Sequence, residues 1–218
     1  MPRVFPSPFY PCSLRLAVEV LSSWPRVYKY NNFATQAEID TIFTHIHAWE
    51  GKSKHDETGH SFELPISQDP IMEDLHQRTV SFLNLTDAPG LTSATQTFRI
   101  RHYNDSLGEY HPDHTDWFDT GASTLILSAL LVLEGPEEGG DTEFVKLHPP
   151  LTIKPVKGNL LVWYSCTRDG QEDKMSNHKS TKLIKGQKWT ATNFLWTDKA
   201  FCCRDPLLPR LPAPASVA

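Results

Sequence analysis

The sequence predicts a mainly β fold in which N-terminal helices buttress a jelly-roll barrel, the double-stranded β-helix. Two observations support this fold class. Residues 36–49 and 70–83 carry helical patterns, whereas from residue 98 onward short β-type runs alternate with turn signals. Short strands in this number after two helices are typical of a jelly roll covered by helices. The chain of 218 residues is long enough for one domain with a sizeable core.

The first helix is predicted from its start signal and its apolar face. Thr35 can cap residues 36–49, and Glu38, three positions later, completes a capping box. The apolar stripe repeats at helical spacing and consists of Ile39, Ile42, Phe43, Ile46 and Trp49. We interpret this stripe as core packing.

The second helix is predicted at residues 70–83. Asp69 is a good N-cap, and Pro70 suits the first helical position because its missing N–H would have no partner there. Ile71, Leu75 and Phe82 form its apolar face, which we also interpret as core packing.

The strands are predicted from alternation and from the turns between them. Turn signals stand at Gly139-Gly140, at residues 155–158 and at Lys185-Gly186. The expected strands are residues 98–103, 110–117, 125–133, 142–145, 151–154, 159–164, 176–181 and 188–196. We therefore place the barrel core at about residues 96–197, within a domain of residues 23–200.

Proline-rich segments flank this domain. Residues 1–22 are expected to form a poorly ordered extension, and residues 201–218 a disordered tail. The start of the chain is too broken by proline to be interpreted as a signal peptide. Two interpretations remain open: a soluble protein, or a sequence that lacks its targeting segment.

The charge pattern limits the partners. The net charge is −5, and acidic and basic residues are spread along the chain, so no basic stripe suggests nucleic acid. No apolar run approaches the roughly 20 residues needed to cross a bilayer. The sequence does not define an oligomeric state.

Cysteines and glycosylation motifs bear on the cellular compartment. None of the cysteines has metal-type C-x2-C spacing, so we interpret them as unligated and incidental. They are Cys12, Cys166, Cys202 and Cys203. Two sequons, Asn84-Leu85-Thr86 and Asn104-Asp105-Ser106, would matter only in a secretory compartment. They favour the lumen of the endoplasmic reticulum, with the cytoplasm as the alternative.

Three His-x-Asp/Glu pairs are candidate metal ligands. His55/Glu57 lies in a polar stretch without a strand pattern, and Pro112 interrupts the pair His111/Asp113. His114 and Asp116 stand in a predicted strand, where residues i and i+2 point to the same face. This third pair can therefore reach one metal, although a hydrogen-bonded surface pair is the alternative.

A distant histidine and a lysine strengthen the third pair. His178 follows a buried-looking strand and a polar loop, so with His114 and Asp116 it could complete the two-histidine, one-carboxylate face that binds non-haem Fe(II). Lys188 shares a strand face with Thr190, and a lysine that faces a barrel interior needs a counter-charge. A bound dicarboxylate would supply one. The alternative is that Lys188 faces solvent while Trp189 faces the core.

These residues together resemble the prolyl 4-hydroxylase catalytic domain of the 2-oxoglutarate oxygenases. The resemblance runs from about residue 18 to residue 196, and the order and spacing of its fragments are specific. The matching fragments are residues 18–26, 108–110, 114–116, 138–144, 154–159, 178 and 185–189.

The resemblance implies a role for each matching position. His114, Asp116 and His178 would be the iron ligands, and Lys188 would bind the distal carboxylate of 2-oxoglutarate. Tyr103 matches a tyrosine that hydrogen-bonds the same carboxylate, with a half-buried strand aromatic as the alternative. Thr190 could add a hydroxyl beside Lys188. Molecular oxygen would be the second co-substrate, and L-ascorbate the expected reductant.

Several departures from the family pattern concern the substrate. Leu125 stands where many members have an arginine that faces the peptide, and Phe194 replaces a usual tryptophan. His111, or the displaced Tyr110, stands in place of a tyrosine shortly before the His-x-Asp pair. These positions bear on how a polypeptide lies over the metal and not on the iron or co-substrate.

The sequence therefore predicts an Fe(II)- and 2-oxoglutarate-dependent dioxygenase that hydroxylates peptidyl-proline to 4-hydroxyproline, with release of succinate and CO2. Its partner would be a peptide or protein substrate, most naturally a proline-rich one. One alternative is an oxygenase of the same fold with a non-proline substrate. A second is a non-catalytic binding module.

Overall fold

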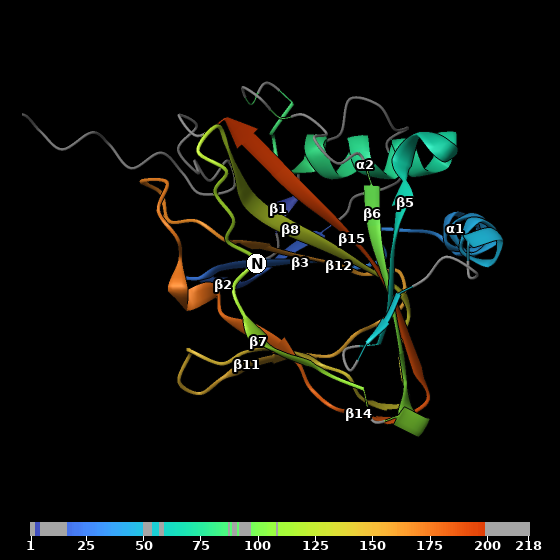
Figure 1. The fold of residues 1–218 in the computed structure, drawn as a ribbon. Coiled ribbons are helices and arrows are strands. Elements are labelled where there is room, and N and C mark those ends of the chain that lie inside the picture. Colours follow the sequence, from blue (N-terminus) through green and yellow to red (C-terminus); the bar gives the residue numbers. More distant parts are fainter. Residues whose placement is uncertain are drawn as a thin grey trace, which may run out of the picture.

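Two antiparallel sheets face each other in the computed structural model (Figure 1). The structure describes residues 3–4, 17–49, 54–56, 59–86, 88, 91, 97–107 and 109–198. The major sheet has nine strands in the order β1-β2-β3-β12-β8-β15-β6-β5-β4, and the minor sheet has four in the order β11-β10-β13-β7. A further pair joins β14 to β9. The predicted jelly-roll class is confirmed, although within these ranges the two large sheets are not hydrogen-bonded into one closed barrel.

The bounds of the major-sheet strands are β1 (Arg3–Val4), β2 (Ala17–Ser23), β3 (Arg26–Tyr30), β4 (Lys54–Asp56), β5 (Gly59–Pro65), β6 (Thr97–Asn104), β8 (Ser123–Glu134), β12 (Leu160–Tyr164) and β15 (Gln187–Asp198). The minor sheet consists of β7 (His111–His114), β10 (Thr142–Phe144), β11 (Leu151–Ile153) and β13 (His178–Ser180). The small pair is β9 (Glu138–Gly139) and β14 (Leu183–Lys185).

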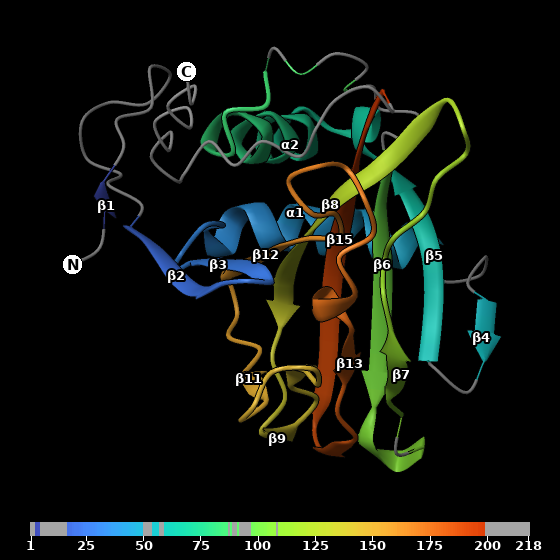
Figure 2. The same cartoon turned by 90° about the vertical axis from the view of Figure 1, so that its left-hand side faces the viewer.

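Helices α1 (Gln36–Trp49) and α2 (Pro70–Phe82) cover the face of the major sheet that points away from the minor sheet (Figures 1 and 2). Both begin as predicted. The Thr35 N–H donates to Glu38 Oε2 at 2.7 Å, and the Glu38 N–H donates to Thr35 Oγ1 at 3.3 Å, so the capping box is present. Asp69 caps α2 by accepting from the Ile71 N–H at 2.8 Å. Short 3₁₀ turns at Ile66–Gln68, Asp105–Leu107 and Lys174–Ser176 complete the elements.

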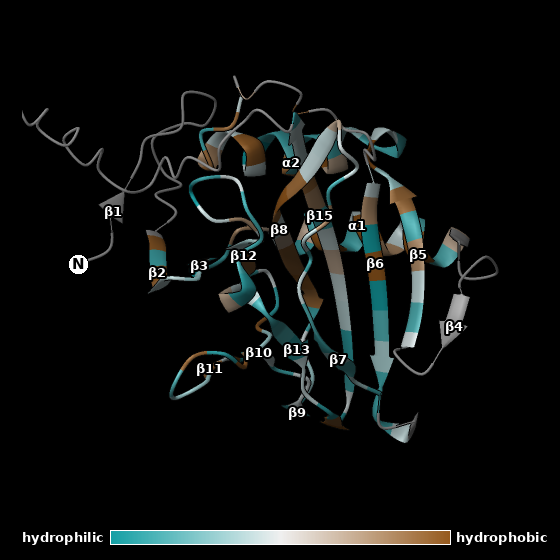
Figure 3. Cartoon of the chain, turned by 60° about the vertical axis from the view of Figure 1, so that its left-hand side comes forward, coloured by the Kyte–Doolittle hydropathy of each residue, from teal (hydrophilic) through white to brown (hydrophobic). Residues whose placement is uncertain are grey.

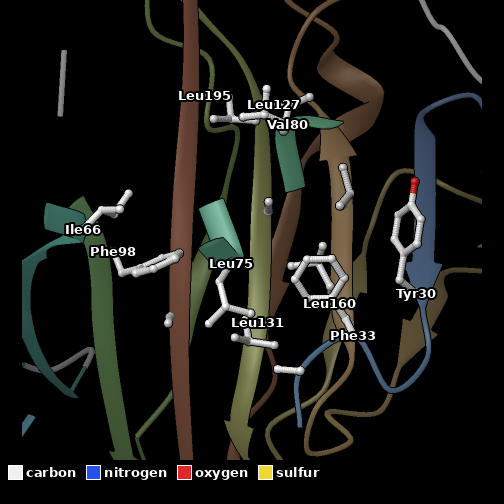
Figure 4. Packing of buried hydrophobic residues seen from close by; sticks show 14 of the residues in the cluster. Tyr30, Phe33, Ile66, Leu75, Val80, Phe98, Leu127, Leu131, Leu160 and Leu195 are labelled. Carbon is white, nitrogen blue, oxygen red and sulfur yellow. The ribbon is translucent and has the colours of Figure 1, made fainter. Parts of the chain in front are cut away.

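The major sheet divides the interior into two parts because alternate residues point to opposite faces. On β12, Leu160, Val162 and Tyr164 belong to the large core under the helices, whereas Leu161 and Trp163 face the minor sheet. Leu75 and Val80 of α2 pack into the large core beside strand residues such as Leu131 and Leu195 (Figure 4). Figure 3 shows hydrophilic residues along β7 and β13, the strands across from this core. The major sheet thereby separates the large core from a second, smaller hydrophobic cluster that faces the minor sheet.

Several elements differ from the prediction. The boundary of the poorly ordered extension at residue 22 was wrong, because β2 begins at Ala17 and pairs with β3. The stretch around His55 was predicted as a loop, but residues 54–56 form edge strand β4. The strand predicted at residues 110–117 ends at His114, and Pro112 lies within it because β7 is an edge strand that tolerates a missing N–H. The tail at residues 201–218 and most of residues 1–16 lie outside the described residues.

Candidate active site

Strand register brings the two predicted histidine ligands together. His114 ends β7 and His178 begins β13, and these two residues are direct partners in the antiparallel ladder. Their ring centroids are 4.5 Å apart. Asp116 follows β7 by two residues, and one ligand atom from each of the three residues lies within 4.8 Å of the others. The structure thus brings all three predicted ligands to one point between the sheets.

Asp116 reaches this point by a route that the sequence did not predict. The strand ends at His114, so strand alternation does not orient Asp116. Instead, Ser128 Oγ of β8 donates to Asp116 Oδ2 at 2.5 Å. The neighbouring Thr115 Oγ1 donates to Glu172 Oε1 at 2.8 Å, which ties the same segment to the loop before β13. Asp116 is therefore held by the major sheet on one side of the pocket and faces histidines of the minor sheet on the other.

Backbone carbonyls orient both imidazoles. Nδ1 of His114 lies 2.9 Å from the Pro112 carbonyl oxygen, and Nδ1 of His178 lies 3.0 Å from the Ser176 carbonyl oxygen. Since a carbonyl only accepts, each Nδ1 carries a proton, so Nε2 is the nitrogen of each ring that can bind a metal once it is deprotonated. The Nε2 atoms are 3.3 Å and 3.8 Å from carboxylate oxygens of Asp116. Two imidazole Nε2 atoms and one carboxylate that converge in this way fit a divalent metal such as Fe(II).

The electrostatics of the three groups also suit a cation. Burial raises the pKa of Asp116, but the hydrogen bonds from His114 and Ser128 and the nearby His178 outweigh burial and hold it below its usual value. Burial lowers the pKa of His178. Burial also acts to lower the pKa of His114, but the hydrogen bond and charge of Asp116 prevail and raise it. Asp116 therefore stays ionised and His178 neutral, as metal ligands must be.

Lys188 lies in the same pocket, so the solvent-facing alternative was wrong. Its side chain is 2% exposed, and Nζ donates to the Gly140 carbonyl at 2.6 Å and to Ser180 Oγ at 2.9 Å. Burial lowers the pKa of Lys188 to about 8, against the opposing charge of Asp141. Trp189 faces the helix side of the sheet. A buried ammonium group at the bottom of a polar pocket is suited to a ligand carboxylate.

The two remaining predicted residues lie beside Lys188. Tyr103 of β6 is buried, and Lys188 Nζ is 5.1 Å from its ring centroid. Thr190 is buried on the same face of β15, and both residues line the pocket that contains the triad. All six predicted site residues therefore line one pocket: Tyr103, His114, Asp116, His178, Lys188 and Thr190.

The pocket contains residues to which the sequence reasoning assigned no role in the site. His111 was considered as part of a competing metal pair and as the replacement of a family tyrosine; its ring lies at a tilt, 4.2 Å from that of His114, and lines the pocket. Burial, together with the charges of His114 and Arg101, lowers the pKa of His111 to about 4. Arg99 and Arg101 also line it, and the alternation of residues 97–104 could have revealed them.

A second, aromatic pocket adjoins the first. It is lined by Glu63, Arg99, Thr115, Asp116, Trp117, Phe118, Leu125, Phe194 and Trp196. Arg99, Asp116 and Phe194 line both pockets, so the two form a continuous surface. Phe118 is 59% exposed, and its ring meets that of Trp196 edge-on at 5.8 Å. Leu125 and Phe194, the two departures from the family pattern, both belong to this aromatic groove.

Cys166 and the two sequons bear on the cellular compartment. Cys166 is disulfide-bonded, so the interpretation of this cysteine as incidental was wrong; the other three cysteines lie outside the described residues. Asn84 is exposed just after α2, whereas the side-chain oxygen of Asn104 accepts hydrogen bonds from the backbone and hydroxyl of Ser106. Among the described helices, none has the length and apolar character to cross a membrane.

Comparisons with known proteins agree with this site. Residues 98–196 match the sequence model of the 2OG-Fe(II) oxygenase superfamily. Probable prolyl 4-hydroxylase 10 of Arabidopsis thaliana is 25% identical over 212 residues, which cover 82% of this chain and 71% of that relative. Probable prolyl 4-hydroxylase 9 of the same plant is 28% identical over 206 residues, with 81% and 70% covered.

A solved structure shares the fold. The viral collagen prolyl hydroxylase from Paramecium Bursaria Chlorella virus-1, in its 2OG complex, superposes with a TM-score of 0.65 at 20% identity. The superposition covers 78% of this chain and 96% of that chain.

The fold, the clustered triad and the match to the family model together place residues 98–196 in the 2OG-Fe(II) oxygenase superfamily. The cofactor of this superfamily is Fe(II), and its co-substrates are 2-oxoglutarate and O2. The chain is an enzyme of this class. Within the class its relatives are prolyl 4-hydroxylases, and the resemblance to a prolyl 4-hydroxylase catalytic domain is confirmed.

Proposed function

We propose that this protein hydroxylates peptidyl-proline to 4-hydroxyproline, with oxidation of 2-oxoglutarate to succinate and CO2. The observation that carries the proposal is one pocket in which His114, Asp116 and His178 converge and Lys188 lies buried beside them. The names of the relatives supply the substrate class.

Each residue of the pocket has a task in this reaction. His114, Asp116 and His178 would hold Fe(II), and Lys188, with Tyr103 and Thr190 beside it, would bind the distal carboxylate of 2-oxoglutarate. When bound, Fe(II) and 2-oxoglutarate supply the oxidising chemistry that transfers one oxygen atom of O2 to the substrate. The protein orients the donors through the Pro112 and Ser176 carbonyls. Tyr103, Lys188 and Thr190 are buried, so this end of the pocket excludes bulk water.

The aromatic groove supports a peptide substrate. Proline-rich segments adopt the polyproline II conformation and bind to grooves lined by aromatic rings. Trp117, Phe118 and Trp196 supply such rings next to Asp116. A chain that lies on them would pass directly over the metal ligands, which is where a proline must be presented.

A turnover assay with paired variants tests the proposal. The wild-type protein, Fe(II), 2-oxoglutarate and ascorbate are incubated with blocked proline-rich peptides, and succinate and peptide mass are measured together. We expect peptide-dependent succinate and a gain of one oxygen atom on proline. Asp116→Ala should abolish both products. Asp113→Ala changes an exposed carboxylate of β7, three residues earlier in the chain, and should leave both unchanged.

A different outcome would redirect the assignment. Succinate without hydroxylated peptide would favour an oxygenase of the same fold with a lysyl or small-molecule substrate. That alternative draws on Leu125 and Phe194, which line the substrate groove in place of the family's usual residues. No succinate from folded, iron-loaded wild-type protein, or full activity in Asp116→Ala, would contradict the proposal outright.

The reductant and the compartment belong to the same proposal. L-Ascorbate would restore activity lost in turnovers that do not hydroxylate substrate, so its omission should shorten the linear phase of the assay.

We place the protein in the lumen of the endoplasmic reticulum, because the disulfide of Cys166 suits an oxidising compartment. Expression through a secretory pathway should attach a glycan to exposed Asn84, and Asn84→Gln should remove it. A wild-type protein whose measured mass shows no glycan would contradict this location.

A further inference from the structure

We propose that Arg101, with Arg99, binds a carboxylate of the substrate, so that the preferred substrate is a proline-containing peptide with an acidic group close to the target proline. This inference rests on the proposed prolyl hydroxylation and adds to it the charge of the sequence that surrounds the proline.

The arginines lie on the wall of the catalytic pocket. Arg99, Arg101 and Tyr103 are alternate residues of β6, so they share one face, and all three line the pocket of the metal ligands. Arg101 is the register partner of Thr190 on β15.

Cations dominate the lining of this pocket. The lining includes Arg99, Arg101, Lys179 and Lys188, whereas its carboxylate is Asp116, a proposed metal ligand. The two positive charges of Fe(II) and the one negative charge of Asp116 sum to one positive charge, and Lys188 adds a second. Because 2-oxoglutarate carries two negative charges, it balances this inner part alone. The arginines of the pocket wall are therefore not needed to balance the charge of the co-substrate.

The cationic side chains of the pocket differ in how far they are exposed, and we assign them different roles accordingly. Lys188 is buried at the bottom of the pocket, but Arg99 and Arg101 are only partly buried and are open to a substrate that arrives later. Lys179 is directed to Glu143, with its Nζ 2.8 Å from the carboxylate. Arginine also forms paired hydrogen bonds to a carboxylate with fixed geometry, which a lysine cannot do.

Arg99 connects this wall to the aromatic groove. Its Nε donates to Glu63 Oε1 at 2.7 Å, and its guanidinium lies 5.0 Å from the centre of the Phe194 ring. These two contacts hold Arg99 at the junction, where it lines both pockets. A peptide that follows the aromatic rings toward the metal would pass Arg99 and then Arg101. The surface is thus complementary to a chain that combines proline with an acidic side chain.

The test uses a host peptide with blocked ends and one central proline. Glu, Gln or Lys is placed in turn at each of the two positions on either side of the proline, and a Gln peptide with a free C-terminal carboxylate distinguishes a chain end from a side chain. Hydroxylation is measured as kcat/KM for the wild type, Arg101→Gln, and Arg168→Gln as the control. Arg168 is an exposed arginine outside both pocket linings. Thermal unfolding checks that each variant is folded.

For the wild type we expect kcat/KM for the best Glu peptide to exceed that for its Gln counterpart by about tenfold or more, with the Lys peptide poorest. Arg101→Gln should reduce this preference to about twofold or less while the KM for 2-oxoglutarate changes little, and Arg168→Gln should keep it. Titration of the metal-free protein with the same peptides, followed by tryptophan fluorescence, should show the same order of affinity. High salt should weaken the preference.

Other outcomes would overturn the inference in distinguishable ways. Equal hydroxylation of Glu and Gln peptides would remove the acidic preference and leave prolyl hydroxylation standing. A raised KM for 2-oxoglutarate in Arg101→Gln, with the peptide preference intact, would assign Arg101 to the co-substrate. Succinate formation without hydroxylation of any peptide would overturn the proposed substrate and this inference together.

Discussion

The chemistry of this site depends on single hydrogen bonds that fix charge and orientation. Asp116 has no strand ladder to hold it, so its position relies on the 2.5 Å hydrogen bond from Ser128. The histidines depend in the same way on one carbonyl each. Partners that orient metal ligands typically change metal affinity by about 10- to 100-fold when they are removed.

Ser128→Ala should therefore weaken metal binding without removing a ligand. We expect the Kd for Mn(II), a redox-stable substitute for Fe(II), to rise by about 10- to 100-fold because the Asp116 carboxylate loses its fixed orientation. Calorimetric titration measures the change. Ser123→Ala is the matched control, since Ser123 begins the same strand and is bonded to Thr120. An unchanged Kd in Ser128→Ala would show that Asp116 is held by other contacts.

Lys188 should give the co-substrate a pH dependence. Its pKa is lowered to about 8, so the ammonium group is charged below this pH and loses its charge as the pH rises through it. Since kcat/KM reports the free enzyme, kcat/KM for 2-oxoglutarate should fall above about pH 8, while kcat stays flatter because the bound carboxylate favours the charged form. Lys188→Arg should retain charge and move the decline to higher pH. A flat kcat/KM from pH 7 to 9 in the wild type would contradict this role.

At the scale of elements, tight turns position the groups that face Lys188. Gly139 ends β9 with φ +79°, and an added Cβ would lie 2.3 Å from the Lys182 carbonyl oxygen. The next residue, Gly140, supplies the carbonyl that accepts from Lys188. The turn that the sequence indicated by its glycine pair therefore positions the carbonyl that accepts from Lys188.

Gly139→Ala should affect both stability and co-substrate binding. We expect the free energy of unfolding to fall by about 1–3 kcal/mol and the KM for 2-oxoglutarate to rise, because the β9–β14 pair must separate. Chemical denaturation and initial rates measure the two effects. Gly170→Ala is the control for backbone strain alone: it also has positive φ, but an added Cβ has nothing within 4 Å. Equal losses in both variants would show that the close approach to Lys182 has no part.

An element could be predicted from the sequence where its signals lie within its own residues. Helices α1 and α2 were placed almost to the residue, because caps and apolar stripes are local signals. Edge strand β4 was missed because a short, polar strand lacks alternation and is defined only by its partner. The triad was proposed from spacing, but the register of His178 against His114 and the support from Ser128 are long-range and need the folded chain. Arg101 was overlooked although strand alternation places it on the same face as the predicted site residue Tyr103.

At the scale of the whole molecule, the proposed metal site joins the two sheets. His114 and His178 belong to the minor sheet, whereas Asp116 is bonded to Ser128 of the major sheet. Within the described residues, hydrogen-bonded ladders do not close these sheets into one barrel. A metal ion that binds all three ligands would therefore connect the sheets across the polar pocket, and its binding energy would stabilise the folded state.

Metal loading should accordingly raise the melting temperature. With Mn(II) at about 100 times its Kd, binding to the folded state alone adds about 2.7 kcal/mol, which corresponds to roughly 5–10 °C for a domain of this size. Scanning calorimetry with Mn(II) and with a chelator measures the shift. Asp116→Ala should lose it, and Asp113→Ala, which removes an exposed carboxylate of β7, should keep it. A wild-type shift that survives in Asp116→Ala would mean that the ion stabilises the fold from a different site, and the connection between the sheets would then have to come from the chain itself.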